Sequence, residues 1–282
     1  MRLLSLAAAV GAAVLVAAPA LAATTQAPLK DVHWSFDSPT GFYDQEQLQR
    51  GYKVYKEVCS ACHSMSMVAF RNLGDKGAPF YDPKYPNPND NPVVKTLARD
   101  AQYPDIDSDT GEQIHRPGTT ADYLPNPFPN PIAARAANGG ALPPDMSLLA
   151  AAREGGPRYI YSVVTGDGTA PPAGLTVPTG KYYDPWMPGD LSSNWKGDPN
   201  KVPVGGFIAM PPPLTDNRVT FDDGTKATVD EEAKDVAAFL TWASEPKMDE
   251  RKELGVEVMI FLVIFAGLLY ASYRSIWRNT SH

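Results

Sequence analysis

The chain has 282 residues, a formal net charge of −7 and 28 prolines. A net negative charge disfavours binding to nucleic acid and favours a basic partner, whose approach it accelerates. The prolines are concentrated in the middle of the chain, and proline interrupts helices and the interiors of sheets. We therefore expect a mostly helical protein with long irregular connections between a few helices.

The first 22 residues have the features of a secretory signal peptide. They are apolar apart from Arg2, and Ala20-Leu21-Ala22 matches an A-x-A cleavage site. We expect the mature chain to begin at Ala23 and residues 23–250 to form an exported, periplasmic domain. The alternative is an uncleaved N-terminal membrane anchor.

A helix is predicted to begin near Asp44, where Gln47 three residues later gives the spacing of a capping box. The apolar residues that follow recur at the spacing of one helix face: Leu48, Tyr52, Tyr55 and Cys59. This face ends at the first cysteine of the chain. A second, short helix is expected over 68–73, ending near Gly74.

Residues 59–63 read C-x-x-C-H, the attachment signature of a c-type haem. Cys59 and Cys62 are the only two cysteines, and they can form thioethers to the haem while His63 binds the iron. A structural zinc site commonly needs four Cys or His ligands, and a second cluster is missing from the sequence. A thioredoxin-like site would need a βαβ pattern, and a disulfide would leave His63 unexplained.

Residues 76–131 are dominated by Pro, Asn, Asp and Gly, so we expect an irregular segment. It contains an acidic run of Asp105, Asp107, Asp109 and Glu112. A calcium loop of the EF-hand type needs Gly at its sixth position and Glu at its twelfth, which here are Thr110 and Arg116. A solvated acidic loop is therefore the better interpretation.

Three further helices are expected in the second half of the domain. Residues 132–138 form a short alanine-rich one, and residues 146–154 form another, capped by Asp145 and stopped by Gly155-Gly156. Residues 159–164 are a brief apolar run, and residues 166–206 read as loop. A capping box of Thr228 and Glu231 then begins a strong helix that Pro246 ends.

Residues 254–273 contain one charged residue, Glu257. Their length matches the roughly 20 residues that cross a bilayer core. Tyr270, Tyr273 and Trp277 suit the aromatic belt of a membrane interface, with Arg274 and Arg278 just beyond. We predict a transmembrane anchor over 254–273 and a cytoplasmic tail over 274–282; a buried core helix is the alternative.

An electron carrier needs both axial positions of its iron filled, and a His/Met pair raises the reduction potential. Met65 and Met67 are too close to His63 to reach the opposite face. Met210 is the favoured sixth ligand, because Gly205-Gly206 precedes it and three prolines follow it. The remaining candidates are Met187, Met146 and, for a bis-histidine haem of lower potential, His33 or His115.

These motifs together resemble the cytochrome c1 family, over nearly the whole mature chain. Each is unspecific alone, whereas the combination is highly specific. The stretches that carry the resemblance are CSACHSM at 59–65, AARAANGGALPPD at 133–145, AREGG at 152–156, PPAG at 171–174, MPP at 210–212, FDDGT at 221–225, AKDV at 233–236, WASEP at 242–246 and the C-terminal anchor.

The resemblance implies a mostly α fold: a class I cytochrome c-like haem domain with long irregular insertions, plus one C-terminal transmembrane helix. It also implies one covalently bound haem c. The residues that would hold it are Cys59 and Cys62 as thioethers, His63 and Met210 as axial iron ligands, and Arg153 and Tyr159 near the propionates.

The same resemblance implies a non-catalytic electron-transfer subunit of the quinol–cytochrome c oxidoreductase, or cytochrome bc1, complex. Such a subunit lies in the bacterial inner membrane with its haem on the periplasmic side. Electrons would come from the Rieske iron–sulfur protein and leave to a soluble c-type cytochrome. The anchor would pack beside cytochrome b and membrane lipid, in a dimeric complex.

Two features depart from the family pattern. Some bacterial relatives carry a disulfide before Pro171, whereas Asp167-Gly168-Thr169 contains no cysteine, and residues 190–204 look like an insertion. A stand-alone membrane-tethered carrier is the main alternative function, but it should have a smaller domain. A haem peroxidase would need an open distal site, and a purely structural subunit would not need the haem motif.

Overall fold

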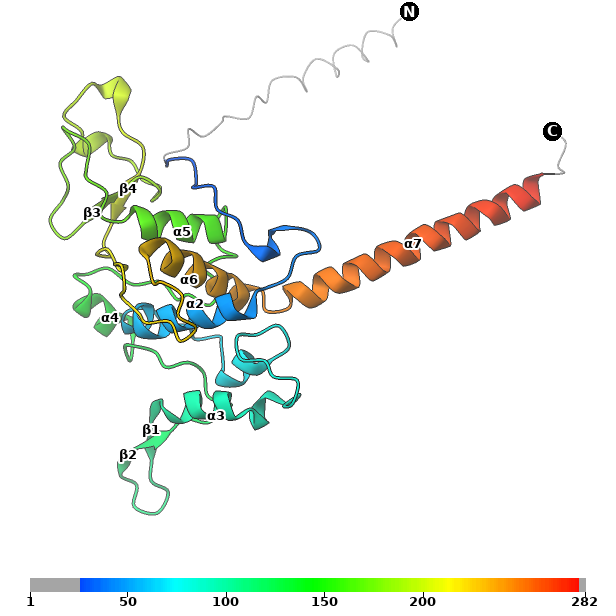
Figure 1. Ribbon diagram of the computed structural model, residues 1–282. Coiled ribbons are helices and arrows are strands. Elements are labelled where there is room, and N and C mark those ends of the chain that lie inside the picture. The colour runs from blue at the N-terminus through cyan, green and yellow to red at the C-terminus, as the bar shows by residue number, and fades with distance from the viewer. Residues whose placement is uncertain (1–25, 279–282) are drawn as a thin grey trace, which may run out of the picture.

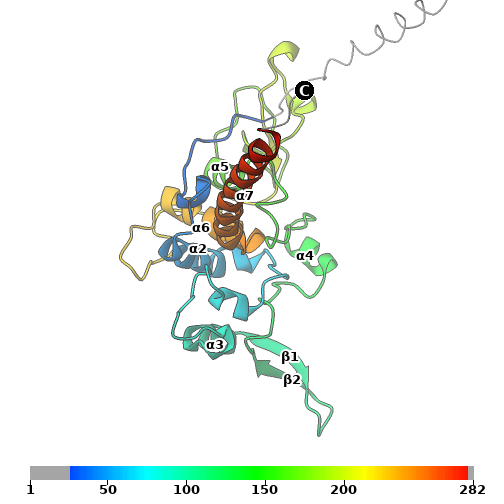
Figure 2. The ribbon, with the colours of Figure 1, turned by 90° about the vertical axis from the view of Figure 1, so that its right-hand side faces the viewer.

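The computed structural model of the protein describes residues 26–278. The predicted signal peptide lies outside these residues, as does the end of the predicted tail. The described chain forms a mostly helical domain, from which one long C-terminal helix projects (Figure 1). Figure 2 looks toward the free end of this helix and shows the domain spread around its base. The expected fold class is confirmed.

Three helices build the core of the domain. They are α2 (Gln45–Glu57), α5 (Pro157–Gly166) and α6 (Val229–Ser244), and α6 contacts both of the others (Figure 1). Gly51 permits the close approach of α2, since a Cβ at this position would lie 2.1 Å from the main-chain oxygen of Asp235. At the centre, Phe239 stacks on Trp242 with ring centroids 5.5 Å apart. Tyr52 and Tyr55 on α2 contact the same Phe239 ring.

The start of α2 confirms half of the predicted capping box. The Asp44 carboxylate accepts hydrogen bonds from the amides of Glu46 and Gln47. The Gln47 side chain, however, donates to Asp235 Oδ1 at 2.9 Å rather than returning to the cap. Burial against α6 therefore overrides the local capping contact. The predicted inner face, with Leu48, Tyr52 and Tyr55, is buried as expected.

The predicted helix over 146–154 is wrong. Those residues form successive turns, and the helix begins later, as α5, with Pro157 at its first position. Gly155 and Gly156 have φ of 85° and 51°, so they precede the helix instead of ending one. Proline is well suited to the first helical position, which explains the start. The apolar run 159–164 is the interior of α5.

The helix expected near the end of the domain is confirmed as α6. Thr228 accepts a hydrogen bond from the amide of Glu231 at 3.2 Å, and the helix ends at Ser244, two residues before Pro246. The alanine-rich helix is α4 (Pro131–Ala137), close to the expected bounds. The short helix near Gly74 is a 3-10 helix, Phe70–Gly74. The segment expected to be irregular also contains α3 (Pro92–Arg99), capped by Asn91.

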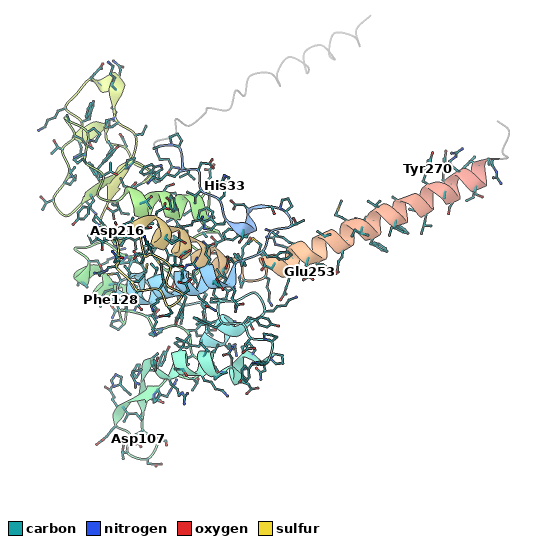
Figure 3. All side chains as sticks on the ribbon, viewed as in Figure 1. His33, Asp107, Phe128, Asp216, Glu253 and Tyr270 are labelled. Carbon is teal, nitrogen blue, oxygen red and sulfur yellow. The ribbon has the colours of Figure 1, made fainter. Side chains whose placement is uncertain are left out.

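Two small antiparallel ribbons were not expected. β1 (Gln102–Ile106) pairs with β2 (Gln113–Pro117), and β3 (Tyr182–Asp184) pairs with β4 (Gly206–Ile208). The acidic run forms the tip of the first ribbon, which projects from the domain with Asp107 near its end (Figure 3). Asp107 Oδ1 accepts from the amides of Asp109 and Thr110. The acidic run is therefore a solvent-exposed hairpin turn.

The C-terminal helix is α7 (Met248–Trp277). It begins six residues before the predicted anchor, so most of the segment between α6 and that anchor is also helical. Its most apolar stretch has a mean hydropathy of 2.3 and is not buried inside the protein. The helix is long and apolar enough to cross a membrane. Glu253 lies near its base and Tyr270 near its far end (Figure 3).

Candidate haem-binding site

The C-x-x-C-H motif follows directly on helix α2. Residues Cys59–Ala61 form a single 3-10 turn. The amides of Cys62 and His63 both donate to the main-chain oxygen of Cys59, at 3.1 and 2.9 Å. Both cysteines are free, with Cys59 half-buried and Cys62 exposed. Burial, together with nearby Cys62, raises the pKa of the Cys59 thiol to about 12. Since neither cysteine is in a disulfide, both sulfurs are available for thioether bonds.

His63 is held in the tautomer that a metal ligand needs. Its side chain is buried, and Nδ1 lies 2.8 Å from the main-chain oxygen of Pro144. A carbonyl only accepts, so Nδ1 carries the proton and Nε2 keeps its lone pair. Burial lowers the pKa of His63, which favours the neutral imidazole. An oriented, neutral imidazole beside two free thiols fits a covalently attached haem.

The loop that carries Pro144 also holds the residues after His63. The Asp145 carboxylate accepts from Ser64 Oγ at 2.8 Å, and from Ser66 N and Oγ at 2.9 and 2.8 Å. Burial tends to raise the pKa of Asp145, but hydrogen bonds from Ser147 and Ser66 outweigh it and lower the pKa to about 2. An ionised carboxylate therefore fixes the motif to this loop. Asp145 was predicted to cap a helix, and it holds the haem motif instead.

The methionine candidates lie on different segments. The amide of Met146 donates to the main-chain oxygen of Ser64 at 2.8 Å, so Met146 belongs to the loop on the histidine side. The Met187 sulfur accepts a hydrogen bond from Tyr159 Oη at 3.7 Å. Met210 is half-buried and lies two residues beyond β4. Met210 lies on a segment separate from the His63 loop. Unlike the Met187 sulfur, its sulfur accepts no hydrogen bond from the described residues.

The segment before Met210 packs closely against Asp184, as the pair Gly205-Gly206 predicted. Gly205 has φ of 110°, and a Cβ there would lie 2.5 Å from the main-chain oxygen of Asp184. At the end of α5, a Cβ at Gly166 would lie 2.3 Å from the Trp186 ring. The ribbon β3–β4 therefore packs on the end of α5. A Cβ at Gly168 would lie 2.9 Å from Pro212, just past Met210.

Arg153 and Tyr159 come together near the start of α5. Arg153 is exposed and Tyr159 is buried. Burial raises the pKa of the Tyr159 hydroxyl, while the charge and a hydrogen bond of Arg153 oppose this effect. A cation and a phenol side by side are suited to binding a carboxylate such as a haem propionate.

Several residues next to the predicted site residues were missed from the sequence. Each segment that carries a candidate site residue also carries a half-buried apolar side chain at the edge of the core. These side chains are Val58, Leu149, Val164, Trp186 and Ile208. They are ordinary apolar residues in the sequence, and only their partial burial distinguishes them. They are available to pack against a large apolar cofactor.

The alternative histidines are poorly placed. His33 is 72% exposed and lies among Asp31, Asp37 and Arg158 (Figure 3). His115 is exposed on β2, in the projecting ribbon. An axial ligand must be shielded from solvent with the haem, so neither suits that role.

A hollow of about 300 Å³ lies beside α2 and touches the haem motif at Ser60, but no residue that would bind the haem lines it. It is lined by Tyr52, Tyr55 and Ser60 on one side and by Leu124 and Pro125 on the other. Neither His63 nor Met210 lines it, so we do not assign it to the haem.

Comparison with known proteins identifies the family of the chain. The Cytochrome C1 family model matches residues 34–280. The cytochrome c1 of Rhodospirillum rubrum is 43% identical over 264 residues, covering 88% of this chain and 87% of that protein. The mitochondrial "Cytochrome c1, heme protein" of Kluyveromyces lactis is 44% identical over 229 residues, covering 81% and 69%. The "Cytochrome b/c1" of Bradyrhizobium diazoefficiens is 43% identical over 265 residues, which cover 88% of this chain but 35% of that protein. The chain therefore belongs to the cytochrome c1 family.

Proposed function

We propose that this chain is the haem-bearing electron-transfer subunit of a quinol–cytochrome c oxidoreductase. The observation that carries the proposal is the hydrogen bond that His63 Nδ1 donates to the main-chain oxygen of Pro144. His63 is the histidine of the C-x-x-C-H motif, and the chain belongs to the cytochrome c1 family. The hydrogen bond prepares the histidine as an iron ligand. The bound haem supplies one-electron chemistry, alternating between Fe(III) and Fe(II).

The chain's residues bind and shield the single covalent haem c. Cys59 and Cys62 would hold it through thioethers, and His63 Nε2 and the Met210 sulfur would be the protein's ligands to the iron. The charged and polar side chains of Arg153 and Tyr159 hold the propionates. The half-buried apolar side chains Val58, Leu149, Val164, Trp186 and Ile208 exclude water. Shielding from water and a methionine ligand both favour a high reduction potential.

The partners are proposed from the family and from α7. Electrons arrive from the Rieske iron–sulfur protein and leave to a soluble c-type cytochrome. We propose that residues 1–22 are removed and that α7 crosses the bacterial inner membrane beside cytochrome b. Residues 23–250 then lie in the periplasm, residues 254–273 in the bilayer and residues 274–282 in the cytoplasm. The complex is dimeric. Two relatives support this: their names are "Cytochrome b/c1" and "Cytochrome b-c1 complex catalytic subunit, mitochondrial".

The test is purification through a tag on this chain in mild detergent, followed by a reduced-minus-oxidised spectrum. We expect the α band of haem c together with b-type haem and a Rieske iron–sulfur signal by electron paramagnetic resonance. A Cys59→Ala/Cys62→Ala double variant is the matched control and should lose covalent haem. A c band without b haem or iron–sulfur signal, under several gentle conditions, would contradict the complex and favour a stand-alone tethered carrier.

A further inference from the structure

Two carboxyl groups near the end of α5 have buried oxygens that find no hydrogen-bond partner among the described residues. Asp184 is fully buried, and its Oδ1 accepts from the amides of Trp186 and Met187 at 2.7 and 3.2 Å. Its Oδ2 is buried with no hydrogen-bond partner among residues 26–278, and the same holds for both carboxylate oxygens of Asp167. Leaving ionised oxygens buried and unpaired is costly. A proton on one of these groups removes that cost.

The two carboxyl groups are neighbours. A Cβ at Gly166 would lie 3.2 Å from Asp184 Oδ1, and Asp167 is the next residue along the chain. Burial and the charge of Asp184 raise the pKa of Asp167 to about 7, against a smaller opposing effect of the Gly168 amide. Burial also raises the pKa of Asp184. Because the charge of an ionised Asp184 disfavours ionisation of Asp167, a proton bound to the pair relieves both the burial and the repulsion.

We propose that Asp167 and Asp184 form a proton-binding site and that its occupancy is linked to the redox state of the haem. The linkage rests on the proposed function, since it requires a haem bound beside the Met210 segment. The proton-binding part rests on this chain alone.

The pair lies against the segment that leads to Met210. A Cβ at Gly168, directly after Asp167, would touch Pro212, and a Cβ at Gly205 would touch the main-chain oxygen of Asp184. Reduction of the haem adds one electron, so the haem becomes more negative by one charge. A negative charge nearby favours protonation of a carboxylate. One electron from the donor is thus accompanied by one proton from solvent, which forms an O–H bond on the pair.

The positive charge of Lys30 opposes both a proton and a metal ion at the pair, and for the proton the effect of burial on Asp184 outweighs it. The Lys30 ammonium lies 4.4 Å from the centre of the Trp186 ring and acts on Asp184, while Asp230 on α6 acts on Lys30. The other titratable neighbours are the hydroxyls of Tyr159 and Tyr183. A cation beside two carboxyl groups leaves little attraction for a second one, and two carboxyl groups fall short of the six to eight oxygens that Ca²⁺ takes.

The first test is a redox titration of the purified holoprotein at several pH values, followed through the haem c band. We expect the midpoint potential to decrease as pH rises from 6 to 8 and to lose this dependence in Asp167→Asn. The control is Asp190→Asn, an exposed aspartate on the loop before β4, which should keep the wild-type dependence. If Asp167→Asn does not fold, Asp184→Asn serves, because its amide oxygen still accepts from Trp186. A slope that survives in the variant would overturn the linkage.

The second test does not need the haem. An Asp with a raised pKa stabilises the folded chain below pH 3.8, and this stabilisation is lost as pH rises to about 7. Asp167→Asn should therefore gain thermal stability over wild type as pH rises from 4 to 7. A constant difference across this range would overturn the proton-binding site itself. Failure of the proposed function would show separately, as absence of the haem c band.

Discussion

The most informative single contact is the one between His63 and a main-chain oxygen. Pro144 supplies its carbonyl, which no substitution at position 144 removes, to orient the imidazole. The two prolines at 143–144 restrict the backbone there, so the acceptor is held in place. At the scale of the residue, the main-chain oxygen of Pro144 therefore orients the His63 imidazole without any contribution from the haem.

Met210 provides a direct test of the axial ligands. Met210→Ala should leave the sixth position of the iron open, so the reduced protein binds carbon monoxide and has a lower reduction potential. The measurement is the carbon monoxide difference spectrum with a redox titration. Met187→Leu is the matched control, because the Met187 sulfur is engaged by Tyr159. A Met210→Ala variant that keeps its potential and does not bind carbon monoxide would show that the assignment is wrong.

Asp145 should contribute stability that depends on pH. Asp145→Ala removes hydrogen bonds from Ser64 and Ser66, and hydrogen bonds to a charged group contribute about 1.5–3 kcal/mol. The pKa of Asp145 is lowered to about 2 from 3.8. Its contribution is therefore fully present above pH 3.8 and is lost as pH falls through about 2. We expect the variant to unfold more easily at pH 7 but to converge with wild type near pH 2.

Denaturant unfolding at both pH values measures this effect. Asp31→Asn is the control, since the Asp31 side chain is 82% exposed and should change stability little. An Asp145→Ala variant as stable as wild type at pH 7 would rule out the loop contact as a stabilising feature.

At the scale of elements, Gly205 fixes the path of the chain to Met210. Gly205→Ala must accept φ of 110° and a Cβ 2.5 Å from the Asp184 oxygen. We expect a loss of more than the roughly 1–2 kcal/mol that a positive φ costs an L-residue, with a weakened methionine–iron bond. The measurements are denaturant unfolding and the methionine-to-iron charge-transfer absorbance. Gly180→Ala is the control, because its φ is 73° and nothing lies within 4 Å. Equal losses in the two variants would contradict the role of close packing.

Local signals predicted some elements well. The T-x-x-E pattern at Thr228 and the Asp44 cap located the starts of α6 and α2, since a cap acts within one turn. The C-x-x-C-H motif indicated the cysteines and His63. Tertiary contacts replaced other predicted local ones. Gln47 donates a hydrogen bond to Asp235 instead of completing the capping box, and Asp145 accepts hydrogen bonds from Ser64 and Ser66 instead of capping a helix.

The missed elements had weak or misleading local patterns. Gly155-Gly156 are equally suited to ending one helix and to preceding another, and only Pro157 favoured the second interpretation. The ribbons β1–β2 and β3–β4 have short strands, and Pro104 lies within β1. The proximity of Asp167 and Asp184 brings the end of α5 to β3, so no periodicity in the sequence points to it.

At the scale of the whole molecule, the base of α7 is fixed to the domain. The Lys252 ammonium donates to three main-chain oxygens, those of Phe36, Ser38 and Gly41, at 2.5, 2.9 and 3.0 Å. One turn earlier, the Asp249 carboxylate accepts from the amide of Tyr43 at 3.2 Å. The N-terminal segment therefore joins the domain to the start of the long helix. If α7 crosses a membrane, these contacts set the orientation of the haem domain above it.

Lys252→Met tests whether this attachment orders the junction. The variant keeps an apolar stem but loses three charged donations, so we expect a loss of about 1.5–3 kcal/mol and faster hydrogen exchange at residues 36–43. The spectrum of the haem should not change, because Lys252 is on the helix base and not on a segment that carries the haem motif. Lys247→Met is the control: Lys247 forms only an exposed pair with Glu250, which is worth roughly 0.2–1 kcal/mol. Unchanged exchange at 36–43 in Lys252→Met would mean that packing of the buried Phe36 and Tyr43 rings, rather than the lysine, holds the domain to α7.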